Sequence, residues 1–190
     1  MDGGDVPAVE HNGVFQLELA PHKGIDLLLE ALAACPTDTP ITLTLVGSDH
    51  GGYTEQMQAL TARLHLEDKV QFLGSRTDVP QLLQAADLFV HPATCQEGFG
   101  ITLIEAMASG VPCLAFPKGA IPEIIGPEID GFLTEEVSAA ALTAGINRAL
   151  ELFTKTPHHW HTLCKNARQK AELFSIERTV AQLEALYQEQ

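Results

Sequence analysis

Two glutamates bracket a glycine-rich turn near the middle of the chain. They are Glu97 and Glu105, and the residues between them that matter most are Gly98, Phe99, Gly100, Ile101 and Thr102. Glycine lets backbone N–H groups approach a ligand closely, and the start of a helix is the positive end of its dipole. The pattern predicts a pocket for phosphates at these amides, with Glu97 on sugar hydroxyls and Glu105 on a ribose. The alternative is a surface loop in which Glu105 complements the dipole.

A lysine stands at the expected start of the first helix, in the segment from Pro21 to Gly24. The helix dipole repels a cation at that end, so Lys23 is unfavourable there unless an anion lies between them. We therefore expect Lys23 to bind phosphate together with the glutamate segment. A solvated lysine whose aliphatic stem lies along the surface is the alternative.

Three further loops carry candidate residues with open alternatives. The loop over 47–52 follows a strand but fits neither common phosphate-loop pattern, so its direct binding is left open. The second loop contains Gly74, Ser75 and Arg76, with Asp78 as the expected helix cap; Arg76 either faces a nucleotide or is solvated. The third offers a second cation, Lys118, and a second carboxylate, Glu123, or is an ordinary turn.

Composition narrows the functional classes. The chain has 190 residues, 45% hydrophobic and 19% charged, which suits one folded domain with a large core. Its net charge is −14 and no Lys/Arg cluster occurs, which excludes a typical duplex nucleic-acid binder and disfavours anionic membrane surfaces. No apolar stretch is long enough to span a membrane and residues 1–5 lack a secretory signal pattern, so we expect a cytoplasmic protein.

No metal site is expected. The cysteines form no C-x-x-C pair and are expected to be free thiols: Cys35, Cys95, Cys113 and Cys164. The histidines at 158, 159 and 161 do not share one helical face, so a solvated helix start is favoured. No D-x-D motif occurs, which argues against a metal-bridged diphosphate, and no cofactor is indicated.

Short apolar runs alternate with amphipathic segments, which predicts an α/β fold with a doubly wound parallel sheet, Rossmann-like, followed by C-terminal helices. The expected strands cover 14–19, 41–46, 69–73, 87–91, 113–116 and 131–134. The expected helices cover 23–35, 53–65, 79–86, 101–109, 138–153, 157–173 and 176–189. We divide the chain into a linker over 1–13, a domain over 14–175 and a C-terminal helix over 176–190. All candidate loops fall at the carboxyl ends of strands, where such sheets bind ligands.

Several segments resemble the retaining glycosyltransferases of family 4, group 1. The resemblance rests, in the family's order, on residues 23–31, 70–74, 86–92, 97–112 and 119–123, and it covers about 14–188. It implies the GT-B arrangement of two Rossmann-like domains, of which this chain would be the C-terminal half. That half binds a nucleotide-diphosphate sugar, and a missing N-terminal half binds the acceptor, which is a saccharide, lipid or protein.

The resemblance also implies residue roles. Glu97 would contact the sugar and Lys23 the phosphates, which makes these two the catalytic candidates. Backbone groups around Phe99 would contact sugar and diphosphate, Glu105 the ribose, and the loop from Gly74 to Arg76 the base. The family needs no divalent metal. For this chain the resemblance implies transfer of a hexose from a UDP- or GDP-linked donor, and any contact with a membrane is expected to be peripheral, through the missing half.

One departure keeps other functions open. The family usually places an arginine five or six residues before the lysine, where this chain has Leu17 and Glu18, so a bidentate phosphate clamp is absent there. The alternative is therefore a non-catalytic nucleotide-binding or interaction module of the same fold. An epimerase or phosphorylase of related architecture is disfavoured by the Gly-Phe-Gly sequence at 98–100.

Overall fold

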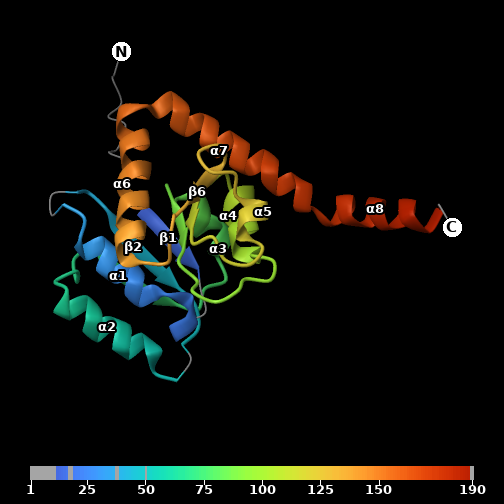
Figure 1. Ribbon diagram of the computed structural model, residues 1–190. Coiled ribbons are helices and arrows are strands. Elements are labelled where there is room, and N and C mark those ends of the chain that lie inside the picture. The colour runs from blue at the N-terminus through green and yellow to red at the C-terminus, as the bar shows by residue number, and fades with distance from the viewer. Residues whose placement is uncertain (1–11, 17–18, 37–38, 50, 189–190) are drawn as a thin grey trace, which may run out of the picture.

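A computed structural model describes residues 12–16, 19–36, 39–49 and 51–188 (Figure 1). The strands are β1 (Asn12–Gln16), β2 (Thr42–Val46), β3 (Val70–Gly74), β4 (Phe89–His91), β5 (Cys113–Ala115) and β6 (Gly131–Leu133). The α-helices are α1 (Ile25–Ala33), α2 (Tyr53–Arg63), α3 (Val79–Gln84), α4 (Ile101–Ala108), α5 (Ile121–Ile124), α6 (Ala139–Lys155), α7 (Pro157–Ala171) and α8 (Ile176–Gln188). Two 3₁₀ turns complete the order: η1 (Pro21–Lys23) and η2 (Glu172–Phe174).

The six strands form one sheet in the order β3-β2-β1-β4-β5-β6, and every neighbouring pair is parallel. The chain winds outward from β1 to β3 and then returns to place β4 on the other side of β1. The prediction of a doubly wound parallel sheet is confirmed. In such a sheet the point where the winding reverses opens a crevice at the carboxyl ends of the two central strands, which here are β1 and β4.

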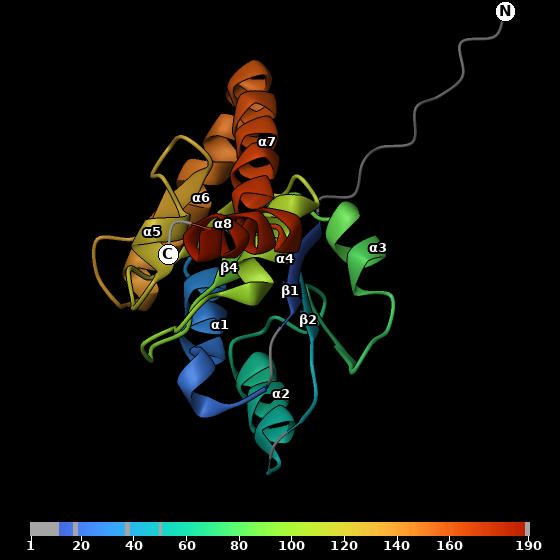
Figure 2. The same ribbon diagram turned by 90° about the vertical axis from the view of Figure 1, so that its right-hand side faces the viewer.

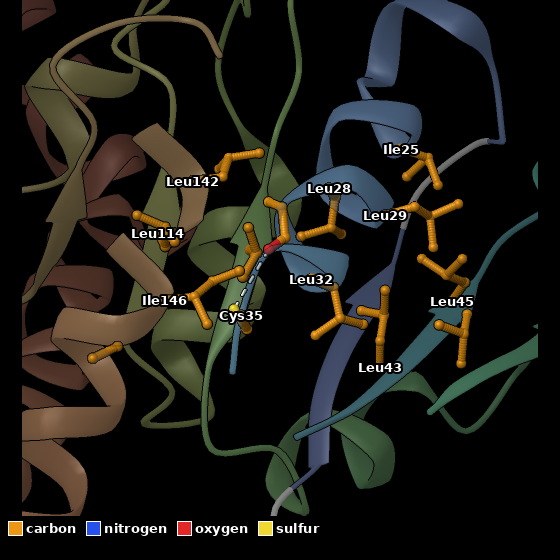
Figure 3. Packing of buried hydrophobic residues seen from close by; sticks show 14 of the residues in the cluster. Ile25, Leu28, Leu29, Leu32, Cys35, Leu43, Leu45, Leu114, Leu142 and Ile146 are labelled. Carbon is orange, nitrogen blue, oxygen red and sulfur yellow. Dashed lines mark hydrogen bonds between the residues drawn. The ribbon is translucent and has the colours of Figure 1, made fainter. Parts of the chain in front are cut away.

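Alternating side chains of the strands build two cores, one on each face of the sheet. On β5, Leu114 joins the cluster beneath α1, α2 and α6, whereas Cys113 and Ala115 join the cluster beneath α4 and part of α7. Figure 3 shows the first core, where Leu28 of α1 and Ile146 of α6 lie among aliphatic side chains of the sheet. Burial on both faces explains why β4 and β5 are buried at every residue and mostly apolar.

The first predicted helix is wrong at its start. Residues 21–23 form η1, Gly24 adopts a left-handed conformation with φ of 68°, and α1 begins only at Ile25. A Cβ atom at Gly24 would clash with the carbonyl oxygen of Pro92, so this position requires glycine. Lys23 therefore precedes α1 and ends η1 instead of occupying the helix's first turn.

Other boundaries shift by a few residues. The first strand is β1 (Asn12–Gln16) rather than 14–19, and Leu19 pairs with Asp49 in an isolated bridge. Leu17 and Glu18, where the family's arginine is missing, lie outside the described residues, as does the predicted linker up to residue 11. The short helix α5 was not predicted, because four residues are too few for a periodic pattern.

The last helix leaves the body of the protein. Figures 1 and 2 show α8 extending beyond α7, and none of its residues is buried. Its apolar side chains are exposed: Ile176, Val180, Leu183, Leu186 and Tyr187. Within the described residues, no helix combines the length and apolarity needed to cross a membrane.

Candidate functional site

The candidate site lies at the carboxyl ends of β1 and β4, where the sheet changes its winding direction. The segment after β1 carries Lys23 on η1, and the loop after β4 carries Glu97. These two loops are joined by the carbonyl of His22, which accepts hydrogen bonds from the backbone N–H of Thr94 at 2.9 Å and from its hydroxyl at 3.1 Å. Residues more than 70 positions apart are thus held side by side.

One carboxylate oxygen of Glu97 is the centre of the site. Its Oε2 atom lies 3.7 Å from Nζ of Lys23 and 3.2 Å from Nε2 of His91. The Lys23 and Glu97 side chains are 16% and 20% exposed, so water screens their attraction less than it would on an open surface. The structure thus brings Lys23 and the glutamate segment together, and their joint binding of phosphate stays a prediction.

His91 is a site residue that the sequence analysis did not single out. It ends β4, its side chain is 2% exposed, and its ring stacks on Phe89 two residues earlier. Burial lowers the pKa of His91, against the opposing pull of the Glu97 carboxylate, and so favours the neutral ring. The available signal was a polar residue at the carboxyl end of an otherwise apolar strand.

The backbone of Glu97 is fixed by the loop that follows β5. Its carbonyl accepts a hydrogen bond of 2.9 Å from the N–H of Ala120. Gly119 lies so close that an added Cβ would stand 2.6 Å from the nitrogen of Glu97. Two neighbouring loops therefore hold the segment that carries the central carboxylate.

The start of α4 follows Glu97 by four residues in the chain. Gly100 is its N-cap in a left-handed conformation, and no side chain caps the helix. Phe99 and Ile101 are 55% and 62% exposed, although both are large and apolar. An uncapped helix start with exposed neighbours suits an anion with an apolar or ring-shaped attachment.

The remaining predicted ligand-binding residues differ in how exposed they are. Glu105 is exposed on α4, one turn from its start, and Thr102 is half-buried there. Lys118 is half-buried in the loop after β5, and Glu123 is exposed on α5. Gly98 is exposed in the loop beside Glu97. Their contacts with a ligand remain predictions.

The loop after β3 differs from expectation. Asp78 occupies the N-cap position of α3, but its side chain makes no capping bond. Instead both of its oxygens accept hydrogen bonds from Arg76, at 2.6 and 2.8 Å, and these bonds lower the pKa of Asp78. Gly74 and Ser75 are exposed. Since β3 is three strands from β4, this loop lies on the order of 14 Å across the sheet, so only an extended ligand reaches both.

The loop after β2 already satisfies its own amides. The carboxylate of Asp49 accepts hydrogen bonds from the N–H groups of Gly52 at 3.2 Å and Thr54 at 2.9 Å. These amides open α2, so the side chain takes the place that an anion would otherwise occupy. His50 of this loop lies outside the described residues.

All four cysteines are free, and no cluster of His, Cys, Asp or Glu in the described part of the chain is placed to hold a metal ion. Burial raises the pKa of the thiols of Cys35 and Cys113, and raises that of Cys164 to about 11. Cys95 is half-buried in the loop beside Glu97. It is therefore the thiol best placed to react.

We predict that a thiol reagent at pH 8 modifies Cys95 well before the other three. Thiolate is the reactive form, and a pKa near 11 for Cys164 leaves it on the order of a hundredfold less thiolate than an ordinary cysteine. Stopped-flow absorbance with a chromogenic disulfide would show one fast phase. Replacing Cys95 with serine should remove that phase, and its persistence in this variant would contradict the assignment.

Comparisons with known proteins bear on the family and the fold of this chain. The family model described as glycosyl transferases group 1 matches residues 14–170. N-acetyl-alpha-D-glucosaminyl L-malate synthase from Bacillus anthracis is 34% identical over 166 residues, which are 87% of this chain and 42% of that protein. The crystal structure of Anabaena Alr3699/HepE in complex with UDP has a TM-score of 0.80 and 34% identity, and the match covers 93% of this chain and 50% of HepE.

A further solved structure bears on the fold alone. The C-terminal domain of a glycosyl transferase group 1 family protein, LpcC from Francisella tularensis, has a TM-score of 0.73 at 22% identity. The match covers 87% of this chain and 86% of that domain. By contrast, the chain spans about half the length of the curated relatives it matches.

Proposed function

Because the chain belongs to the glycosyl transferases group 1 family, we propose that it is the donor-binding half of a retaining glycosyltransferase, which binds a nucleotide-diphosphate sugar. The observation that carries the proposal is the ion pair between Lys23 and Glu97, set beside the uncapped start of α4. The ammonium of Lys23 can bind a phosphate and the carboxylate of Glu97 can bind hydroxyl groups. The two are close enough for one ligand to contact both.

The diphosphate lies between the ammonium of Lys23 and the backbone amides at Ile101 and Thr102. It displaces Lys23 from the Glu97 oxygen, which then accepts hydrogen bonds from the sugar hydroxyls. Glu105, further along α4, takes the ribose. The outer loops reach the rest of the ligand, with Lys118 and Glu123 on one side, and Gly74, Ser75 and Arg76 near the base on the other.

Charge development explains how these groups promote transfer. Breaking the anomeric C–O bond leaves negative charge on the diphosphate and positive charge on the sugar ring. Lys23 and the start of α4 stabilise the leaving diphosphate, which is commonly the largest electrostatic contribution to catalysis. The acceptor attacks from the face of the leaving group, as in retaining members of the family, and Glu97 serves as a sugar ligand rather than as a nucleophile. No metal or cofactor enters this scheme.

Uridine is the best-supported base and a hexose the best-supported sugar. The structure of HepE that resembles this chain contains UDP, and another structure of HepE is in complex with UDP-glucose. UDP and UDP-glucose are therefore the first ligands to test on this chain, with GDP and ADP as alternatives.

The acceptor would be bound by a second half of a GT-B arrangement. The match covers 50% of HepE and 49% of a glycosyltransferase from Rickettsia africae. The exposed apolar face of α8 and the exposed Phe99 and Ile101 are surfaces that such a half would cover. Any peripheral contact with a membrane would come through that half.

A non-catalytic module of the same fold is the second candidate. It is favoured by Glu18, which places a carboxylate where the family usually has a phosphate-binding arginine. Such a module would bind nucleotide, yet transfer no sugar when a complementary acceptor half is supplied.

We expect isothermal titration calorimetry to detect binding of UDP, GDP or ADP to this chain. Because the proposed phosphate ligands are an ammonium and backbone amides, EDTA should leave the affinity unchanged. The absence of heat with all three nucleotides, confirmed by unchanged thermal unfolding in their presence, would end the proposal.

A further inference from the structure

We propose that His91 is a positioning residue that holds the Glu97 carboxylate in place for sugar recognition. The proposal deepens the proposed function and rests on it, since it concerns the same donor site. It assigns a role to the one buried histidine of β4, which does not itself touch the ligand. His91 would act through Glu97 and through no other group of the site.

The geometry of the pair supports this role. His91 lies at the end of β4 with its side chain 2% exposed, and Phe89 stacks on its ring with centroids 6.4 Å apart. Its Nε2 atom lies 3.2 Å from Oε2 of Glu97. The ring is thus held by the core on one side and presents one nitrogen to the site on the other.

The surroundings of Nδ1, the other ring nitrogen of His91, indicate which tautomer is present. Within the described structure, Nδ1 of His91 is buried and has no hydrogen-bond partner. A buried N–H without an acceptor is costly, and an ionised carboxylate can only accept a hydrogen bond. The single proton of the neutral ring therefore belongs on Nε2, which donates to Glu97. Burial and the nearby Lys23 lower the pKa of His91 and favour this neutral form.

The two partners of Glu97 then have different duties. Lys23 has a flexible stem and is the group that a diphosphate attracts away from the carboxylate. His91 belongs to a strand and cannot follow. When ligand binds, the imidazole is the partner that stays and keeps the carboxylate oriented towards the sugar.

The experiment compares UDP with UDP-glucose on two variants of the chain. His91→Leu keeps a side chain of similar volume but removes the N–H that donates to Glu97. His91→Gln retains an N–H near the position of Nε2. We expect His91→Leu to bind UDP like wild type but UDP-glucose about tenfold more weakly, the effect of losing one hydrogen bond to a charged group. His91→Gln should recover most of that loss. An equal loss for both ligands, or no loss for either, would overturn the proposal.

A second measurement tests the hydrogen bond between His91 and Glu97 without adding a ligand and without replacing His91. Long-range ¹H–¹⁵N spectra should show the neutral tautomer protonated at Nε2 at pH 7, and Glu97→Gln should shift that nitrogen's resonance. A proton on Nδ1, or a resonance unchanged in Glu97→Gln, would overturn the pairing even if nucleotides bind. Failure of all nucleotides to bind would instead refute the proposed function and leave the spectra to decide the pairing.

Discussion

The Gly119→Ala variant is expected to lose about 3 kcal/mol of unfolding free energy and most of the affinity for UDP-glucose that depends on the sugar. Gly119 has a φ of 57°, which is strained for alanine, and its new Cβ would stand 2.6 Å from the nitrogen of Glu97. The atoms that the new Cβ would meet all belong to the backbone of Glu97, so none of them can rotate away as a side chain could. The Glu97 segment must shift, and with it the carboxylate that faces Lys23.

Gly51→Ala is the matched control for this substitution. Gly51 has a similar φ of 70°, but an added Cβ there would meet nothing within 4 Å. It should lose only the cost of the left-handed conformation, about 1 kcal/mol, and keep its affinity for UDP-glucose. Urea unfolding and calorimetry measure the two quantities. Similar losses in both variants would show that backbone strain, rather than the contact with Glu97, sets the effect.

Replacing Lys23 with alanine should weaken UDP binding by about tenfold to a hundredfold. A charge-assisted hydrogen bond to phosphate contributes roughly 1.5 to 3 kcal/mol, and Lys23 is the proposed cation for the diphosphate. Glu97→Gln should act in the opposite direction and strengthen UDP binding. It removes a negative charge that lies 3.7 Å from the same ammonium and competes with the phosphates for it.

The control for net charge is Lys155→Ala. Lys155 is 72% exposed on α6 and pairs with Glu151 of the same helix, so its removal changes the overall charge by the same amount without touching the site. Its UDP affinity should remain within about twofold of wild type, because exposed charges at a distance are screened by salt. Equal weakening by the two lysine variants would refute a direct role for Lys23.

The fold class, and the loops that carry Lys23 and Glu97, could be predicted because their signals are local. Short segments rich in apolar residues, such as 41–46 and 69–73, predicted parallel strands, and the structure has β2 and β3 there. The glutamates around Gly98–Gly100 marked the start of α4. The order of the strands was not predicted, since it depends on pairing between distant segments rather than on local pattern.

What escaped the sequence analysis depends on contacts across loops. Gly24 breaks the first helix because it must approach Pro92, which is 68 positions away in the chain. Asp78 does not cap α3, since Arg76 engages both of its oxygens. His91 became a candidate only when the structure placed Glu97 against its buried ring. None of these contacts leaves a periodic pattern in the sequence.

The pairing of Lys23 with Glu97 has a consequence for product release. In the proposed reaction, the nucleoside diphosphate would still neutralise Lys23 after the sugar has been transferred, but no sugar hydroxyl would remain on the Glu97 carboxylate. The carboxylate can then compete for the ammonium again, and re-forming their ion pair favours departure of the spent nucleotide. The ion pair of Lys23 and Glu97 would thus act as an internal competitor that discriminates the intact donor from its by-product and helps the site to empty after each turnover.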